Sequence, residues 1–363
     1  MTEAAEDDLA AIRGPARRYL ADAATPGHLK ALLDQTGGFD RELWRGAVEQ
    51  GWPALSAPEA LGGMGLGWRA LSLLVQELGD RTVSLPLIAG AVIVAALSAA
   101  ADAALLERFG RPLAEGAKVA CLAFAEPGDS GLPACPAVLL RDGTLSGIKA
   151  TAAFASVADV ALLHAWDGAS VALVLAELDQ PAVRRESPAT FDQARSVARL
   201  HFDGAAAHRL GGVPGGDDSI AQAALATAFE QIGGASACVY MARDYALQRK
   251  AFGQVIGRFQ AIKHKLADMY WKTEIARGCA IDALDALDAG DPRWRGLAAA
   301  ARVAATEAYD FAAQENAQTH GGLGITWEAM PHHHSRRARS LALELGAKQY
   351  WRDRMLTLIG FVP

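Results

Sequence analysis

The chain has 363 residues, 51% of them hydrophobic, so it is long enough to bury a large core and to form two or three domains. Its formal net charge of −6 gives no reason to expect a nucleic-acid partner. The four cysteines are widely spaced, which indicates buried thiols in a reducing compartment, and the acidic start lacks the apolar core of a secretory signal. We therefore expect a soluble, cytoplasmic protein.

One uncharged stretch, residues 83–101, is just long enough to cross a bilayer. It consists mostly of alanine and valine, contains Pro86 and Gly90, and has no basic or aromatic flanks. These features favour a buried helix over a membrane span.

The first part of the chain has helical apolar spacing, with Leu71, Leu74, Val75 and Leu78 as an example. This spacing predicts an N-terminal helical domain over residues 1–116.

The pattern changes near Lys118. Asp142-Gly143 and Asp167-Gly168 each separate two short apolar runs, which is a hairpin signal. Residues 198–202 alternate between apolar and polar, as in a half-buried strand. We expect an antiparallel β-domain over residues 117–214.

The last part, residues 215–363, returns to helical spacing and predicts a four-helix bundle. Ser219-x-x-Gln222 resembles a capping box, and the helix that it opens can run to Phe252. Asp291-Pro292 predicts the start of a third helix, and a final helix is expected from Trp327 to Leu358. The predicted fold class is α+β, mainly α: helices, a β-domain, then a helical bundle.

Arg249 lies near the C-terminus of the long predicted helix and is the first candidate for a binding role, together with Phe252 and Gln260. A guanidinium is well shaped to clamp a pyrophosphate. It could equally be a cation that the helix dipole favours.

A second candidate binding segment runs from Gln318 to Gly324. Its first glycine can end a helix, but a cap does not need Gly321, Gly322 and a preceding Gln318 together. Glycines also let backbone N–H groups approach a phosphate or a ring edge.

Glu230 lies inside the long helix, one turn before Gly233 and Gly234. Two glycines in a helix interior suggest that something packs hard against that backbone. A carboxylate beside such a groove could serve as a general base, or it could be a surface group next to a helix crossing.

His332-His333-His334 does not predict a metal site, because consecutive side chains do not share a helical face. With Arg336, Arg337 and Arg339 these residues are expected to form a basic, solvated surface. No nucleophile-elbow pattern supports hydrolysis.

Taken together, these segments resemble the acyl-CoA dehydrogenase family over nearly the whole chain. The resemblance rests on residues 245–260 with His264 to Met269, on Gln318 to Gly322, on Pro58-Glu59 with Gly62-Gly63, and on Leu145-x-Gly147-x-Lys149 with Ala158-Asp159.

The resemblance implies FAD held between subunits. Arg249 and Phe252 would meet the pyrophosphate, and the adenosine and pyrophosphate side of the shared site would be lined by Gln260, Gln318, Gly321 and Gly322. In family chemistry a carboxylate removes the α-proton of an acyl-CoA thioester while the β-hydride goes to the flavin. A trans-2-enoyl-CoA results, and electron-transfer flavoprotein reoxidises the cofactor.

The sequence departs from the family pattern in three places. The usual Glu-Gly-Thr falls at Leu345-Gly346-Ala347, with Glu344 one position early, which turns it about 100° on a helix. The usual Thr-Glu-Pro reads Ala125-Glu126-Pro127, so a hydroxyl is missing. The usual Trp-x-Thr falls at Thr151-Ala152-Ala153, where an aromatic wall and another hydroxyl are missing.

The first hypothesis is therefore an FAD-dependent acyl-CoA dehydrogenase with Glu230 as the base, or Glu344 as the alternative. The second is a non-catalytic or flavin-completing subunit of a heteromeric acyl-CoA dehydrogenase. A third is an oxidase or another flavoenzyme on the same scaffold. Relatives that share Ala-x-Glu-Gln-x-Gly-Gly are often subunits of mixed-subunit enzymes acting on bulky acyl chains such as steroid side-chain thioesters. We expect an acyl-CoA substrate, an electron-transfer flavoprotein partner, and a homo-oligomer or heterotetramer.

Overall fold

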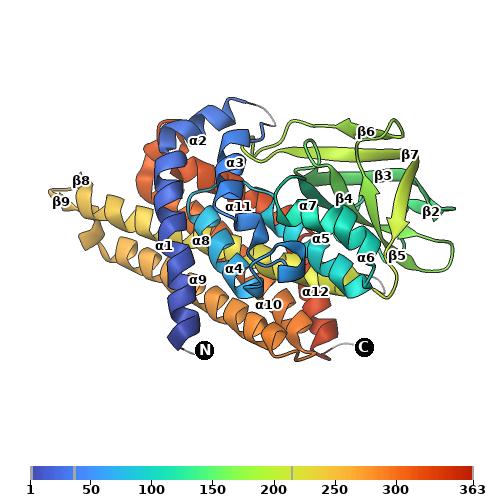
Figure 1. Ribbon diagram of the computed structural model, residues 1–363. Helices are drawn as coiled ribbons and strands as arrows, with labels where there is room; N and C mark the ends of the chain where they lie inside the picture. Colours follow the sequence, from blue (N-terminus) through green and yellow to red (C-terminus); the bar gives the residue numbers. More distant parts are fainter. Residues whose placement is uncertain (1–2, 36–37, 214–215, 362–363) are drawn as a thin grey trace.

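The computed structural model describes residues 3–35, 38–213 and 216–361, and places a β-domain between two helical parts of the chain (Figure 1). The helix at the N-terminus crosses the long C-terminal helices (Figure 1). The β-domain lies on the right in this view, opposite the β8–β9 end of the molecule (β8 Lys250–Ala251, β9 Gln254–Val255) on the left. The predicted fold class, α+β and mainly α with this order of parts, is confirmed.

The first helical part contains seven α-helices in the described residues and three short 3₁₀ or π segments. The α-helices are α1 Glu3–Ala23, α2 Pro26–Leu33, α3 Arg41–Glu49, α4 Gly67–Asp80, α5 Leu87–Ala100, α6 Ala103–Leu105 and α7 Arg111–Ala114. α5 is the predicted buried helix, and no helix in the described parts of the chain combines the length and hydropathy needed to cross a bilayer.

The β-domain is a seven-stranded sheet of β1 Ala120–Ala123, β2 Leu139–Arg141, β3 Thr144–Ala153, β4 Val160–Trp166, β5 Val171–Glu177, β6 Val183–Glu186 and β7 Val197–Arg209. Both predicted hairpins, β2–β3 and β4–β5, are confirmed. The expectation of a wholly antiparallel sheet is wrong in one region, because β4 pairs parallel with β1 and β2. The sheet closes on itself, since β4 pairs with β5 as well as with β2.

Closure of the sheet explains why β4 is apolar at nearly every position. Val160 and Leu162 pack with helical residues of the neighbouring parts, whereas Ala161 and Leu163 pack inside the sheet. Because both faces of the strand are buried, its sequence does not alternate between apolar and polar residues.

The C-terminal part contains α8 Asp217–Gln248, α9 Gln260–Asp288 and α10 Trp294–His320 as long helices, followed by α11 Pro331–Leu343 and α12 Lys348–Leu358. The predicted final helix is wrong in one respect: it is broken between α11 and α12, where Leu345 and Gly346 both have positive φ, 61° and 97°. This turn sets the direction of Glu344.

Three helix ends differ from the prediction. α8 begins at Asp217 after Gly216, and Ser219 lies buried inside it, so the capping box is wrong. α8 also ends at Gln248, because the next residues form a hairpin. α10 begins at Trp294, since Asp291 instead accepts from the backbone N–H of Arg293 in the turn before it.

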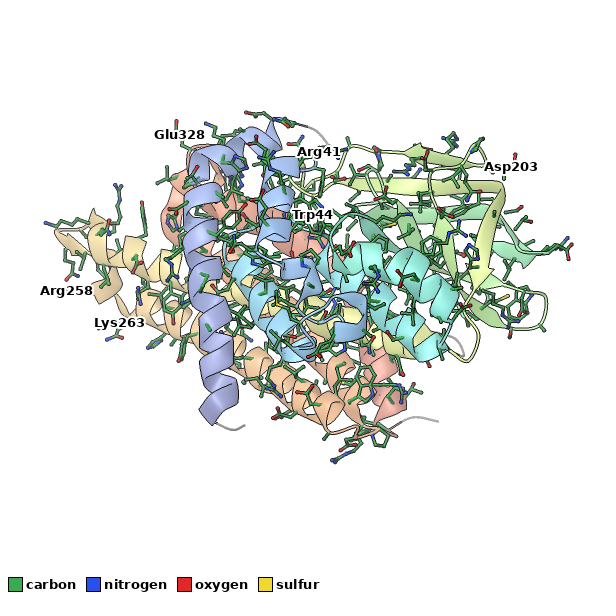
Figure 2. The ribbon with its side chains drawn as sticks, viewed as in Figure 1. Arg41, Trp44, Asp203, Arg258, Lys263 and Glu328 are labelled. Atoms are coloured by element: carbon green, nitrogen blue, oxygen red, sulfur yellow. The ribbon has the colours of Figure 1, made fainter. Side chains whose placement is uncertain are left out.

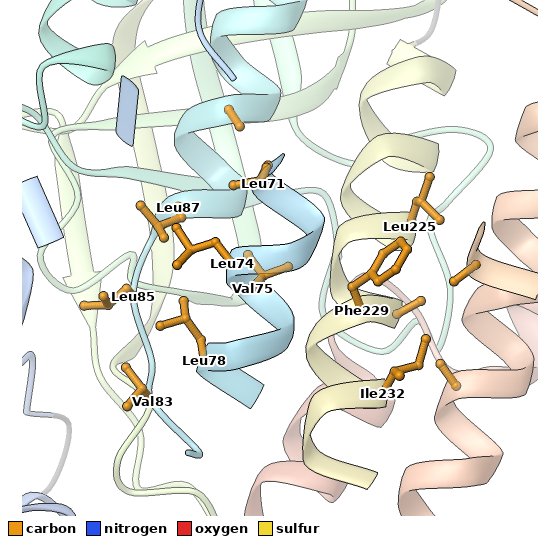
Figure 3. Close-up of a cluster of buried hydrophobic side chains, with 14 of the residues drawn as sticks. Leu71, Leu74, Val75, Leu78, Val83, Leu85, Leu87, Leu225, Phe229 and Ile232 are labelled. Carbon is orange, nitrogen blue, oxygen red and sulfur yellow. The ribbon is translucent and has the colours of Figure 1, made fainter. Parts of the chain in front are cut away.

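α4 and α8 cross with their backbones in contact, and Leu74, Phe229 and Ile232 belong to the apolar cluster around the crossing (Figure 3). A Cβ on Gly233 would lie 1.9 Å from the carbonyl oxygen of Gln76. A Cβ on Gly234 would lie 2.3 Å from the ring of Tyr309, so both glycines after Glu230 serve helix packing.

This crossing gives a prediction of stability. Gly233→Ala should lower the free energy of unfolding by about 2 kcal/mol, since the clash outweighs the gain in helix propensity. The matched control is Gly278→Ala in α9, where no atom lies within 4 Å of the added Cβ. Thermal unfolding should show a lower melting temperature for the first variant and an unchanged or higher one for the second; equal melting temperatures would contradict this packing.

Candidate flavin-binding site

Arg249 and Phe252 lie at a projecting hairpin beyond α8, formed by β8 Lys250–Ala251 and β9 Gln254–Val255 (Figure 1). The two-residue turn between the strands has positive φ at Phe252, 50°, and at Gly253, 81°. A left-handed backbone is costly for phenylalanine, and the ring is 95% exposed. The ring is thus held outside the core of its own chain, available to another molecule.

The hairpin and the glycine segment lie at the same end of the bundle. Tyr245, in the last turn of α8, stacks on His320, the last residue of α10, with ring centroids 4.2 Å apart. Arg249 caps the first of these helices, and Gly321 follows the second. The two predicted binding segments therefore follow neighbouring helix ends, although the hairpin residues do not line the cavity next to the glycine segment.

All six predicted cofactor-binding residues are exposed. Gln260 begins α9, next to the hairpin, and Arg258 and Lys263 mark this end of the molecule (Figure 2). Arg249, Phe252 and Gln260 are not among the residues that line the cavity next to the glycine segment, described next. A ligand that contacts all six predicted residues must therefore also contact protein surface outside that cavity.

Gln318, Gly321 and Gly322 line a cavity of about 700 Å³ between α10 and α11. A second cavity of about 300 Å³ continues toward the β-domain. The two cavities share Phe191 and Arg339, so they form one elongated surface, which we name the α11 groove. Its volume is in the range of sites for ligands of cofactor size.

The structure explains the glycines between Gln318 and Gly324 in different ways. A Cβ on Gly324 would lie 2.3 Å from the carbonyl oxygen of Ala317, so close packing explains it. Nothing lies within 4 Å of a Cβ on Gly321 or Gly322. Bare backbone that faces open space in a groove leaves room for a phosphate or ring edge that approaches from outside.

Two of the positions that depart from the family pattern lie in the groove. Thr151 and Ala153, at the end of β3, line its inner part. Glu126 instead points into the β-domain, where it bonds the buried Lys149 at 2.6 Å and accepts from two backbone N–H groups. Burial lowers the pKa of Lys149. The hydrogen bond and the negative charge of Glu126 act in the opposite direction and raise it in part.

Glu230 is buried between two guanidinium groups. Its Oε1 accepts from Nη1 of Arg195 at 3.2 Å and from Nη1 of Arg337 at 3.3 Å. Arg337 also bonds Asp192 at 2.6 Å. We name Asp192, Arg195, Glu230, Arg337 and Glu344 the arginine–carboxylate cluster.

Glu344 lies on the other side of Arg195 and meets it with both oxygens, each at 2.9 Å. Burial acts to lower the pKa of Arg195, but Glu230 and Glu344 outweigh it and the pKa is raised. The guanidinium of Arg195 is thus a permanent cation shared by both candidate bases.

Glu344 borders the 300 Å³ part of the α11 groove on one side and a much smaller space on the other. A cavity lined by Thr227, Arg195 and Glu344, among others, has a volume of about 20 Å³. This is room for about one water molecule and not for an acyl chain. Leu345, at the position of the family's glutamate, is buried in the adjoining apolar cluster.

The histidine segment is not the solvated surface that the sequence predicted. His333 and His334 are buried, as is Arg337, because they lie on the face of α11 that packs on the bundle. His334 bonds the hydroxyl of Tyr309 at 3.0 Å, and burial lowers its pKa to about 3.

Sequence reasoning missed Arg195 and Arg337 as partners of Glu230. Arg195 lies in a loop before β7, and Arg337 was grouped with exposed cations. The one indication in the sequence was the place of Glu230 in a tightly packed helix, because a buried carboxylate requires a cation nearby in the fold.

Comparison with known proteins agrees with this fold. Residues 6–117 match the family described as Acyl-CoA dehydrogenase, N-terminal domain, and residues 217–357 match Acyl-CoA dehydrogenase, C-terminal domain. The chain is 34% identical to acyl-CoA dehydrogenase IpdE2 of Mycobacterium tuberculosis, over 91% of both chains. It is 29% identical to benzylmalonyl-CoA dehydrogenase of Aromatoleum aromaticum, over 98% of this chain and 94% of that one.

Solved structures give the same result. A variant of the Tcur3481–Tcur3483 steroid ACAD superposes with a TM-score of 0.92 at 27% identity, covering 98% of this chain and 99% of the other. The ChsE4–ChsE5 complex from Mycobacterium tuberculosis gives 0.89 at 26% identity, covering 100% and 99%. The chain therefore belongs to the acyl-CoA dehydrogenase family, whose members are flavoprotein oxidoreductases acting on CH–CH bonds.

Proposed function

We propose that this chain takes part in the FAD-dependent α,β-dehydrogenation of an acyl-CoA thioester to a trans-2-enoyl-CoA, with electrons passed to an electron-transfer flavoprotein. The observation that carries the proposal is the α11 groove, with open backbone at Gly321 and Gly322. FAD, when bound, supplies the acceptor for the hydride. The chain's own residues bind and orient it: Gln318 and the glycines from the groove, and Arg249 and Phe252 from the hairpin.

A flavin shared between subunits accounts for the division of these residues. The hairpin presents a cation and an aromatic ring away from the core, while the groove presents bare backbone. An isolated chain offers the two halves on separate surfaces. We propose that a second subunit brings a hairpin to the groove.

Glu230 remains our candidate for the base that removes the α-proton, with Glu344 as the alternative. A base must reach the proton that it abstracts. In the conformation described, Oε1 of Glu230 is occupied by two guanidinium donors, and both oxygens of Glu344 by one. Glu344 would have to leave Arg195 to act, whereas the bonds described for Glu230 engage only its Oε1.

The engagement of both carboxylates by Arg195 favours the second candidate role: a flavin-completing subunit of a heteromeric acyl-CoA dehydrogenase. The likeness to the Tcur3481–Tcur3483 and ChsE4–ChsE5 chains supports this role. In that assembly the partner would hold the acyl chain and supply the base. The likeness also favours a bulky acyl group of the steroid side-chain class.

The test is anaerobic titration of the purified assembly with a panel of acyl-CoA thioesters, followed by the visible flavin spectrum. Bleaching of the flavin by one class of acyl-CoA, with formation of the enoyl product, is expected. An assembly with full flavin content that no acyl-CoA bleaches would contradict dehydrogenation. If the chain alone performs the reaction, the flavin-completing role is wrong.

Arg249→Ala should weaken FAD binding by about tenfold to a hundredfold, because it removes charge-assisted hydrogen bonds to phosphate. Arg243→Ala is the matched control, an exposed arginine nearer the middle of α8 that pairs with Asp244. The measurement is the flavin retained per chain after gel filtration. Equal retention in both variants would remove Arg249 from the site.

A further inference from the structure

The α11 groove has a cation at its centre, Arg339, which the sequence placed only on a basic, solvated surface. Arg339 lines both the 700 Å³ and the 300 Å³ cavities. The glycine segment lies on one side of it, and Ala153 and Glu344 of the inner part lie on the other. An elongated ligand that occupies both cavities must pass its guanidinium.

The guanidinium of Arg339 is held by one hydrogen bond and keeps further N–H donors that are not bonded to other described residues. Nη1 of Arg339 bonds Oδ2 of Asp310, on α10, at 3.0 Å. In the part of the chain that the structure describes, Arg339 bonds no other acceptor, and its side chain is 60% exposed. Nε and Nη2 therefore remain available to a molecule in the groove.

The two neighbouring arginines of α11 are already engaged. Arg336 bonds the backbone carbonyl of Phe191 at 2.6 Å and lies over the rings of Phe191 and Trp327. Arg337 is buried in the arginine–carboxylate cluster. Of these three cations, Arg339 is the one that lines the groove.

We propose that Arg339 is a further cofactor-binding residue, held by Asp310 so that it donates to an anionic or carbonyl oxygen of FAD at the middle of the groove. The inference rests on the proposed function. A planar guanidinium with two free N–H directions suits a phosphate oxygen pair or a ring carbonyl, and a point charge such as lysine replaces it only in part.

The experiment is a fluorescence titration of the purified, flavin-depleted assembly with FAD and with riboflavin. Arg339→Gln should raise the Kd for FAD by about tenfold, and Arg339→Lys by less. Arg336→Gln is the control of equal charge on the same helix and should change the Kd by less than about threefold. Melting temperatures should stay near that of the parent protein, because both side chains are partly exposed and paired at the surface.

The riboflavin arm locates the contact. A loss confined to FAD places the guanidinium at phosphate, and a loss for both ligands places it at the ring or its hydroxylated chain; either supports the proposal. An unchanged Kd for FAD in Arg339→Gln overturns it while leaving the flavin site standing. If the parent assembly does not bind FAD at all, the proposed function itself is wrong.

Discussion

The Glu230→Gln variant is expected to unfold with a free energy about 3 kcal/mol below that of the parent protein. The carboxylate is the shared acceptor of Arg195 and Arg337, both of which are buried, so its loss leaves two guanidinium groups undercompensated in a medium of low dielectric constant. Removing one member of a buried ion pair typically costs about 3–5 kcal/mol, and glutamine, which keeps an acceptor oxygen, should lie at the lower end. Chemical or thermal unfolding of the assembly measures this.

The control is Glu307→Gln, which removes an acceptor of Lys348 and Arg352 at the surface. Its cost should stay below about 1 kcal/mol, because solvent screens exposed pairs. The same two proteins also separate the roles of Glu230. An unchanged melting temperature in Glu230→Gln, with full flavin and complete loss of α-proton exchange, would identify a base and not a structural ion pair.

Acid should destabilise the protein from about pH 6.5 downward, through His334. Burial lowers its pKa to about 3 in the folded chain, against an ordinary value of 6.5. A histidine whose folded pKa lies below its unfolded value takes up a proton only on unfolding, so stability is present above pH 6.5 and falls as the pH falls. The slope from this one group is about 1.4 kcal/mol per pH unit. His333, with a pKa of about 4 by burial, acts in the same direction.

Melting temperatures of the parent, His334→Gln and His264→Gln across this pH range test the assignment. Glutamine at 334 can still accept from the hydroxyl of Tyr309 but cannot titrate, so its melting temperature should depend less steeply on pH. His264 is exposed, and its replacement should leave the pH dependence as it was. Identical curves for all three proteins would contradict a buried neutral His334.

Local signals in the sequence predicted most of the fold. Asp142-Gly143 and Asp167-Gly168 specify their hairpins because the turn residues act over a few positions. Gly233 likewise indicated a close backbone contact, which α4 provides. The end of α8 was missed because Phe252-Gly253 forms a hairpin turn that an aromatic residue rarely enters.

The site was less predictable, since its contacts join distant parts of the chain. Arg195 reaches Glu344 across 149 positions, and Arg337 reaches Glu230 across 107. No local pattern encodes such a pair. Arg339 has the same chemical character in sequence as the buried Arg337, and only the direction in which each leaves α11 separates a groove residue from a core residue.

We propose that a second subunit completes the flavin site, with the groove from one chain and the hairpin from another. The direct measurement is size-exclusion chromatography with light scattering and visible flavin absorbance, on the chain alone and with a co-expressed partner subunit. Flavin is expected to elute with assembled protein, and monomeric chains are expected to be colourless. A monomer that retains one FAD per chain would contradict this proposal.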